Sequence, residues 1–263
     1  MRIARFSVDG EVAFGVVEGG AEGVEAGGAD AEVAEIAGHP FGPITFSGRR
    51  LPLPSVRLLA PVLPSKIVAI GKNYADHASE MGGEVPERPL IFLKPSTAVV
   101  GARDTIAYPP SSERVDYEGE LAVVIGRLCR DVPENKAMDV VFGYTCANDV
   151  TARDQQKADG QWSRAKGYDS FCPLGPWIET DLDTLDLRVT TTLNGDVKQD
   201  GRTSQIVHKI PSLIAYITAC MTLLPGDVIL TGTPAGVGPM QVGDEVTVEV
   251  ERIGRLTNTV VPR

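Results

Sequence analysis

Two glutamates, two residues apart, stand directly before an apolar run near the middle of the chain. Glu118 and Glu120 belong to the segment DYEGE, and residues 121–125, LAVVI, are all apolar. On a β-strand such a pair would present two carboxylates on one face, with Gly119 leaving the opposite face open. The apolar run indicates a buried strand, where neighbouring carboxylates repel each other unless a cation or a proton joins them. The alternative interpretation is a solvated strand end, since this spacing is common in exposed strands.

A third carboxylate, Asp149, follows the apolar segment 140–147. At the end of a neighbouring strand it could meet Glu118 and Glu120. Three carboxylates with no His or Cys nearby favour a hard cation, Mg²⁺, Mn²⁺ or Ca²⁺, over zinc, and they leave coordination positions for water and substrate. Alternatively, Asp149 only caps the turn that precedes residues 151–154.

A histidine and a glutamate share one face of a predicted short helix. Residues 73–81, followed by Gly82 and Gly83, have the composition of a two-turn helix with a glycine stop. His77 and Glu80 are three residues apart, so the carboxylate can orient the imidazole and raise its basicity. Such a pair suits a general base for water, and the helix suits a lid over a substrate. An ordinary pair on a helix surface is the alternative.

Three further side chains are candidates for binding an anion. Lys94 ends an apolar strand, Lys166 lies in a turn-rich segment, and Thr233 lies in the turn TGTPAGVG. A lysine at a buried strand end invites a charged partner, and the turn could offer a hydroxyl and backbone N–H groups to a carboxylate. Neither a P-loop nor a dinucleotide-binding glycine motif is present.

The elements that must position these residues are mostly strands. Apolar stretches predict strands at residues 66–70, 90–94, 117–125, 140–147, 187–193 and 228–231, and a final pair at 246–250 and 256–260. Asn194-Gly195 predicts a type I′ hairpin turn. One long helix is predicted from Pro211 to Leu224, with an apolar stripe that packs on the sheet.

The N-terminal part is predicted to be a separate small domain. Residues 1–62 contain a hairpin (3–8 and 12–17), an acidic Ala/Gly-rich piece and a Pro-rich exit, and residues 63–263 form the larger domain with the candidate site. Prolines at positions 52, 54, 61 and 64 cannot sustain a helix or a central strand, so this exit is interpreted as a linker.

Composition and charge narrow the class of protein. Apolar residues make up 43% of the 263 residues, which is enough for a sizeable core, and 28 glycines with 19 prolines favour a turn-rich, β-rich fold. The net charge is −10, with no basic stripe, so neither nucleic acid nor a membrane surface is an expected partner. The sequence also lacks an apolar run of the length of a signal peptide or membrane span. Four scattered cysteines argue against a zinc site or disulfides and point to the cytoplasm.

Six blocks of sequence, in order between residues 66 and 250, resemble the fumarylacetoacetate hydrolase family. They read VAIGKNYADHASEMG, PLIFLKPSTAVVG, VDYEGELAVVIGR, VFGYTCANDVTARDQQ, LNGDVKQDGRTSQ and LLPGDVILTGTPAGVG. The resemblance implies a β-rich α+β fold, with a mixed β-sandwich or β-roll catalytic domain, a small N-terminal domain and a homodimeric state.

The resemblance also implies roles for individual residues. It implies a divalent cation, Mg²⁺ or Mn²⁺ with Ca²⁺ as a further possibility, held by Glu118, Glu120 and Asp149. Catalytic roles fall on His77, Glu80 and Lys166, and substrate-binding roles on Lys94, Gln155 and Thr233.

The leading hypothesis is an enzyme of aromatic-compound catabolism that acts on small 2-oxo or 2-hydroxy-dienoate carboxylates. An isomerase or decarboxylase of 2-hydroxyhepta-2,4-diene-1,7-dioate type is preferred. An acylpyruvate hydrolase that cleaves a C–C bond is the first alternative, because the His–Glu pair suits water activation. A 2-oxopent-4-enoate hydratase and a non-catalytic, Ca²⁺-binding β-domain are further alternatives.

Overall fold

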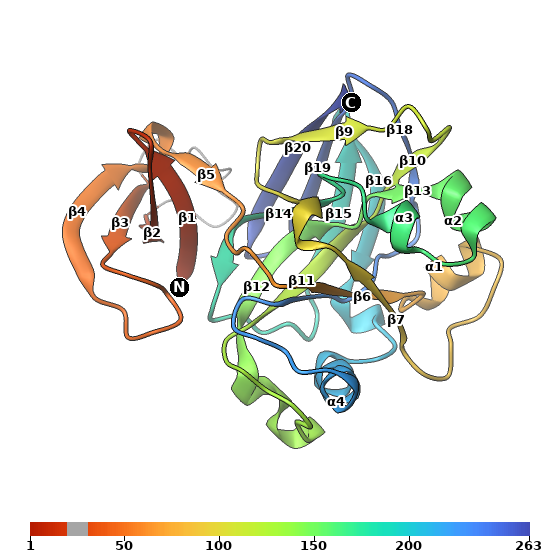
Figure 1. Cartoon of the computed structure of the whole chain (residues 1–263), viewed down its shortest axis with the longest axis horizontal. Helices are drawn as coiled ribbons and strands as arrows, with labels where there is room; N and C mark the ends of the chain where they lie inside the picture. Colours follow the sequence, from red (N-terminus) through yellow and green to blue (C-terminus); the bar gives the residue numbers. More distant parts are fainter. Residues whose placement is uncertain (20–30) are drawn as a thin grey trace.

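The structure, a computed structural model, describes residues 1–19 and 31–263. Strands in three β-sheets are the main regular structure of these residues, as predicted for a β-rich fold with few helices (Figure 1). Part of the acidic Ala/Gly-rich piece, residues 20–30, lies outside the described residues. Within the described ranges, no helix has the length and apolar character needed to cross a membrane.

The largest sheet in the described residues has twelve strands, from both the N-terminal part and the remainder of the chain. Along its main path the strands are β4 (Phe46–Pro52), β3 (Glu32–Ile36), β2 (Glu11–Glu18), β1 (Arg2–Val8), β14 (Cys172–Glu179), β12 (Val141–Asn148), β11 (Gly119–Ile125), β17 (Val228–Leu230), β6 (Ile67–Gly71) and β7 (Leu90–Lys94). Two more strands, β5 (Arg57–Leu59) and β8 (Val99–Val100), pair with β1 and β14. The N-terminal strands β1 to β5 lie beside the rest of the chain in Figure 1, and β1 joins them to β14.

Two smaller sheets and four α-helices complete the fold of the described residues. One sheet contains β13 (Thr151–Ala152), β10 (Val115–Tyr117) and β18 (Gly238–Met240), and the other contains β16 (Asp196–Arg202), β15 (Arg188–Leu193), β19 (Glu245–Val250), β20 (Gly254–Pro262) and β9 (Thr105–Tyr108). The helices are α1 (Ala75–Glu80), α2 (Arg153–Asp159), α3 (Ser163–Lys166) and α4 (Ile210–Cys220), with 3₁₀ turns at Leu53–Ser55, Ser96–Ala98, Glu134–Val140 and Thr203–Gln205.

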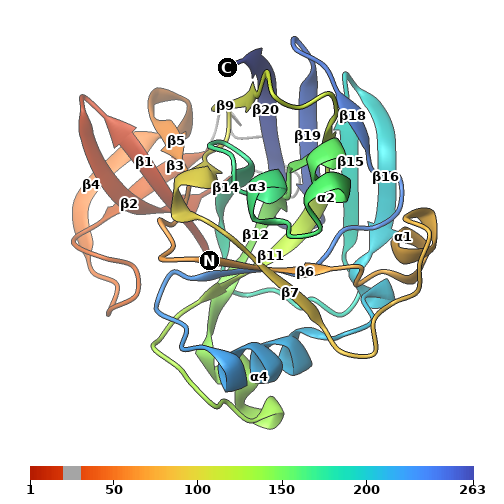
Figure 2. The same ribbon diagram turned by 45° about the vertical axis from the view of Figure 1, so that its right-hand side comes forward.

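The main core lies between the large sheet and its neighbours. Val123 of β11, Ile217 of α4 and Val248 of β19 belong to one buried apolar cluster. Figure 2 shows α4 below the sheet and the strands β15, β16 and β19 standing above it, with α2 and α3 in front. The prediction that the long helix packs on the sheet is therefore confirmed.

The hairpin turn is confirmed, but the end of the long helix is not. Asn194 and Gly195 both have positive φ, 53° and 86°, as a type I′ turn requires. Helix α4 ends at Cys220, four residues before the predicted Leu224. Leu223 instead exchanges two backbone hydrogen bonds with Cys129, so strand pairing replaces the last helical turn.

The Pro-rich exit is not only a linker. Between Pro54 and Pro61, the three residues of β5 pair antiparallel with β1, so the segment adds a short strand beside the main path of the sheet and not a central strand. The prolines flank β5 and leave its backbone donors intact. The division into domains at residues 62 and 63 stays a prediction.

Candidate metal centre and its cavity

Three buried carboxylates converge where two strands of the large sheet end. The expected strand 117–125 is broken at Glu118, which lies between β10 and β11, while Glu120 lies on β11 and Asp149 directly after β12. Glu118 N–H donates to Asn148 Oδ1 at 2.9 Å, and Asp149 N–H donates to the Glu118 carbonyl at 2.8 Å. One oxygen of each carboxylate lies within 4.8 Å of the others. The structure therefore brings together the three residues predicted to bind a metal.

Gly119, directly after the break at Glu118, packs closely against the five-stranded sheet. A Cβ built on Gly119 would lie 2.1 Å from Thr191 Oγ1 and 3.2 Å from a Val248 methyl group. The face opposite the glutamates is therefore filled, not open as predicted. Only glycine permits β11 to approach the second sheet this closely.

The neighbouring carboxylates experience opposite electrostatic surroundings. Burial and the negative charges of Asp149 and Glu118 raise the pKa of Glu120 well above its ordinary value. Burial alone would also raise the pKa of Glu118, but Lys166 and Arg153 outweigh it and hold that pKa below its usual range. A cation in contact with all three carboxylates would remove the repulsion that Glu120 experiences.

Two buried lysines contact the carboxylates from different sides. Lys166, at the end of α3, donates to Glu118 at 2.9 Å and to Asp149 at 2.6 Å. Burial would lower the pKa of Lys166, but these two carboxylates outweigh it and raise the pKa. Lys94, at the end of β7, donates to Asp149 and to the Val150 carbonyl. Lys94 is thus a partner of Asp149 and does not line the cavity described below.

Arg153, which the sequence analysis did not select, forms an ion pair with Glu118. Arg153, the first residue of α2, donates to Glu118 and, at 2.9 Å, to Asp116. Asp116 is buried and also accepts two hydrogen bonds from Arg114. The turn interpretation of residues 151–154 gave no reason to look for this chain of charges.

The predicted base pair is formed on helix α1. His77 is buried, and its Nδ1 lies 3.3 Å from Glu80 Oε2, while the Gly236 N–H donates to the same carboxylate at 3.2 Å. Glu80 therefore orients the imidazole and also joins α1 to the turn that contains Thr233. If Nδ1 carries the proton shared with Glu80, Nε2 is left as the proton acceptor.

The TGTP turn holds Glu120. Gly232 N–H donates to Glu120 Oε2 at 2.6 Å, and Thr233 Oγ1 donates to the Gly119 carbonyl at 2.9 Å. Gly232 has a φ of 103° and lies against Asn73, so a side chain would not fit. The hydrogen bond to Gly119 fixes Thr233 where its side chain lines the cavity.

Of two adjacent glutamines, the structure places the second in the cavity. Gln155 donates to the Ser111 carbonyl at 2.8 Å and accepts from the Tyr168 hydroxyl at 2.9 Å, so its amide faces away from the carboxylates. Gln156 lines the cavity and accepts a hydrogen bond from Arg153 at 2.7 Å. The structure does not bring Gln155 to the predicted position, because one step along a helix turns a side chain by about 100°.

The cavity around these groups is small, about 40 Å³, and has one apolar wall. Phe92, Trp162 and Met81 form this wall, with the two aromatic rings edge to face at 5.1 Å. The Lys166 ammonium lies 5.0 Å from the centre of the Phe92 ring. The remaining polar lining comprises Lys72, His77, Glu118, Glu120, Asp149, Arg153, Gln156, Lys166 and Thr233.

The residues present suit a hard divalent cation. All three candidate ligands are carboxylates, which Mg²⁺ and Mn²⁺ prefer. Two buried polar atoms beside them, the Tyr74 hydroxyl and Asn148 Nδ2, form no hydrogen bond in the described part of the chain. Such atoms are normally satisfied, so the site is built for additional polar groups such as water or substrate oxygens.

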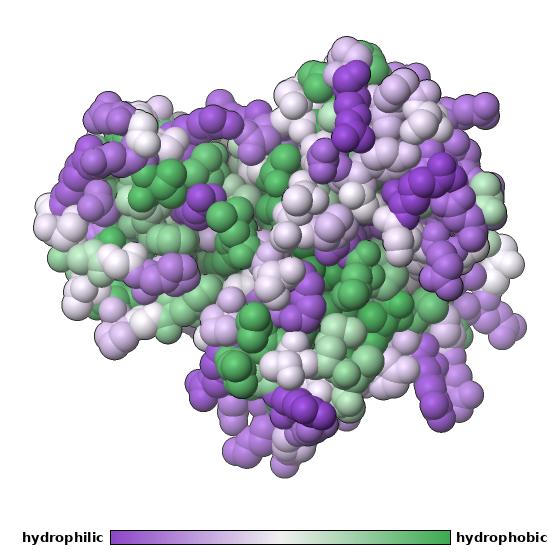
Figure 3. All heavy atoms as spheres, in the orientation of Figure 1, coloured by the Kyte–Doolittle hydropathy of each residue, from purple (hydrophilic) through white to green (hydrophobic). Residues whose placement is uncertain are grey.

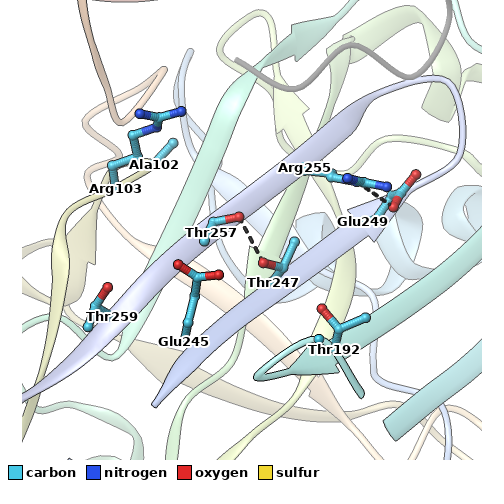
Figure 4. A pocket seen from close by; sticks show the side chains of 10 residues that line it. Ala102, Arg103, Thr192, Glu245, Thr247, Glu249, Arg255, Thr257 and Thr259 are labelled. Atoms are coloured by element: carbon cyan, nitrogen blue, oxygen red, sulfur yellow. Dashed lines mark hydrogen bonds and ion pairs between the residues drawn. The ribbon is translucent and has the colours of Figure 1, made fainter. Parts of the chain in front are cut away.

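A second, larger cavity of about 580 Å³ lies on the outer face of β15, β19 and β20 (Figure 4). Four of its ten lining residues are threonines, and its Arg255 and Glu249 form an ion pair at 2.8 Å. It contains none of the three clustered carboxylates. The chemistry described above therefore belongs to the smaller cavity.

Two family models match consecutive parts of the chain. The one described as "Fumarylacetoacetate (FAA) hydrolase C-terminal" matches residues 66–261, and the one described as "Rv2993c-like, N-terminal" matches residues 1–61. The first match covers all nine residues that the sequence analysis selected for the site.

Similar proteins include isomerases, tautomerases and hydrolases. The chain is 54% identical to a solved structure named 5-carboxymethyl-2-hydroxymuconate delta-isomerase from Mycobacterium smegmatis, with a TM-score of 0.92 and 100% of each chain covered. It is 45% identical over 224 residues to a human mitochondrial oxaloacetate tautomerase, covering 80% of this chain and 71% of that protein. A maleylpyruvate hydrolase from Sphingobium sp. SYK-6, solved with manganese (II) ion and pyruvate, is 33% identical, with a TM-score of 0.78 and 100% and 99% of the two chains covered.

Proposed function

The chain belongs to the fumarylacetoacetate hydrolase family, and on this basis we propose that it is a divalent-metal-dependent isomerase or decarboxylase of small 2-oxo or 2-hydroxy-dienoate carboxylates. The substrate class is that of 2-hydroxyhepta-2,4-diene-1,7-dioate. The observation that carries the proposal is the convergence of three buried carboxylates within 4.8 Å. The isomerase and tautomerase names of similar proteins support the same reaction class.

Glu118, Glu120 and Asp149 would hold the cation, Mg²⁺ or Mn²⁺. When bound, such a cation supplies Lewis-acid stabilisation for negative charge on a 2-oxo oxygen and the adjacent carboxylate. The manganese and pyruvate in the related maleylpyruvate hydrolase support this choice of ligand and metal.

The other polar groups of the cavity would bind and orient the substrate. Lys166 is fixed by Glu118 and Asp149, so its ammonium can offset the charge of the substrate carboxylate. His77, held by Glu80, can carry a proton between oxygen and carbon, from the 2-hydroxyl to C5 in the dienedioate or from C3 to the 2-oxo oxygen in oxaloacetate. The wall of Phe92 and Trp162 excludes water from that side.

The His77–Glu80 pair favours a second candidate function, an acylpyruvate hydrolase. The same imidazole Nε2 could take a proton from a water that attacks the far carbonyl. Isomerisation needs only one proton transfer at carbon, whereas hydrolysis needs a positioned water as well. The two candidates therefore differ in the product and not in the residues.

The test is a panel of substrates assayed with Mg²⁺ and with Mn²⁺. It includes 2-hydroxyhepta-2,4-diene-1,7-dioate, oxaloacetate, acetylpyruvate and fumarylpyruvate. We expect metal-dependent isomerisation of the dienedioate or tautomerisation of oxaloacetate, and a loss of at least about 100-fold in activity and in Mn²⁺ affinity in Glu120→Gln. Glu134→Gln, at an exposed 3₁₀ turn, is the matched control.

Three outcomes decide between the candidates. Rapid hydrolytic C–C cleavage of acetylpyruvate or fumarylpyruvate that His77→Ala abolishes would contradict the isomerase proposal and support the hydrolase. No turnover of any 2-oxo acid, together with a Ca²⁺-dependent rise in melting temperature that Glu118→Ala removes, would support a non-catalytic metal-binding domain. Addition of water without C–C cleavage would identify a hydratase.

A further inference from the structure

Lys72, directly after strand β6, lines the cavity and forms no ion pair with another described residue. Lys72 directly follows β6 and has a φ of 55°, in the left-handed region that residues other than glycine seldom adopt. The next residue, Asn73, fixes this backbone through hydrogen bonds with the Thr231 carbonyl and with His208. Lys72 is half-buried, and it lines the same cavity as the carboxylates.

The other cations of the cavity differ from Lys72 in their pairing. Arg153 contacts Asp116 and Glu118, and Lys166 contacts Glu118 and Asp149. Among the described residues, Lys72 forms no hydrogen bond or ion pair through its ammonium. A half-buried cation in a cavity normally has an anionic partner, so this position suits an anion from a ligand.

The charge of the whole cavity favours a ligand with two negative charges. Apart from His77, the ionisable groups that line it are three cations, Lys72, Arg153 and Lys166, and three carboxylates. These charges cancel, so a divalent cation leaves the cavity with a charge of plus two. A dicarboxylate restores neutrality, whereas a monocarboxylate leaves one positive charge uncompensated.

The Lys72 ammonium lies beside the residues that follow helix α1. A Cβ added to Gly83, just after α1, would lie 2.9 Å from Lys72 Nζ. The ammonium thus lies against the end of the segment that carries His77 and Met81 into the cavity. Lys166, by contrast, reaches the carboxylates from α3.

We propose that Lys72 is a specificity-determining residue that binds the substrate carboxylate remote from the 2-oxo acid group. The inference rests on the proposed function, because it assigns the 2-oxo acid end to the metal and Lys166. The apolar wall of Phe92, Trp162 and Met81 would by itself favour a neutral tail, so Lys72 is what makes a charged tail preferable.

The test compares two enolisable 2-oxo acids of similar size. Oxaloacetate ends in a carboxylate, and acetylpyruvate ends in a neutral acetyl group. We expect Lys72→Met to raise the KM for oxaloacetate about 10- to 100-fold, with kcat and the KM for acetylpyruvate nearly unchanged. Lys72→Arg should restore most of the affinity, and Lys136→Met, at an exposed lysine, is the matched control.

Binding to the Mn²⁺-loaded protein, measured by calorimetry, separates this inference from the proposed function. If the wild type turns over neither acid but binds oxaloacetate in a Lys72-dependent manner, the reaction is wrong and the role of Lys72 stands. If Lys72→Met weakens both acids equally, or neither, the role of Lys72 is overturned whatever the reaction.

Discussion

Asp116 acts on Glu118 through Arg153, which forms an ion pair with both carboxylates. Its carboxylate is fully buried and accepts hydrogen bonds from Arg114 and Arg153. Arg153 in turn contacts Glu118. Asp116 therefore acts as a positioning residue, because it holds the guanidinium that orients a candidate metal ligand.

We expect Asp116→Asn to lower Mn²⁺ affinity about 10- to 100-fold, because Arg153 loses one of its two charged partners and fixes Glu118 less firmly. Titration calorimetry with Mn²⁺ measures the effect. Asp139→Asn, at an exposed aspartate, is the control. An unchanged affinity in Asp116→Asn, with an intact fold by circular dichroism, would show that Arg153 holds Glu118 without help.

The sequence predicted the acidic part of the site better than the basic part. Glu118, Glu120 and Asp149 were found because carboxylates beside apolar strands are unusual and must have a reason. Arg153 and Lys72 were missed, since a single cation in a polar segment looks like surface. Gln155 was implied by the family resemblance, and the structure places Gln156 in the cavity instead, because the rotation of a short helix is not fixed by the sequence pattern.

At the scale of elements, Asp227 joins the loops that precede the parallel strands β6 and β17. Its side chain is inaccessible to solvent and accepts hydrogen bonds from Ser65, Lys66 and the Leu224 N–H. Burial alone would raise the pKa of Asp227, but these hydrogen bonds outweigh it and lower the pKa. The pair β6–β17 carries both Lys72 and the TGTP turn at its end, so this joint also supports the cavity.

Because the folded-state pKa of Asp227 is lowered, its stabilising contribution is present above the ordinary pKa of about 4 and is lost as the pH falls below it. We expect Asp227→Asn to lower the free energy of unfolding by roughly 2–3 kcal/mol at pH 7. The difference from wild type should shrink toward pH 3. Urea unfolding at several pH values measures it, and a difference that is the same at pH 7 and pH 3 would contradict this role.

Element types were predictable from local patterns, whereas their ends depended on distant contacts. The strands and the Asn194-Gly195 turn follow from alternation and turn chemistry. Thr191 and Val248 pack against Gly119 beside the break at Glu118, and Cys129 pairs with Leu223 just after the early end of α4. These partners are far away in sequence, so periodicity could not reveal them.

At the scale of the whole molecule, β7 is an edge strand of the twelve-stranded sheet. It ends the strand order, and its Leu90 and Leu93 are 38% and 46% exposed. Apolar atoms gather on the surface over β6 and β7 in Figure 3. An apolar edge strand of this kind usually has a cover.

We expect the predicted homodimer to cover this edge. Light scattering after gel filtration should give twice the mass of one chain for the wild type and a smaller mass for Leu93→Lys. Val197→Lys, on an exposed edge strand of the five-stranded sheet, should keep the dimer. A monomeric wild type would contradict the homodimer, and a loss of mass only in Val197→Lys would place the contact on the other sheet.

One of the two tryptophans lies in the carboxylate cavity, so its fluorescence can report on binding there. The chain has two tryptophans, and Trp177 is buried with its indole N–H bonded to the Ile253 carbonyl at 2.8 Å. Trp162 instead lines the carboxylate cavity, edge to face with Phe92. Changes in intrinsic fluorescence on filling the cavity will therefore come from one known indole over a constant background, so occupancy can be followed in solution without a dye, a label or turnover.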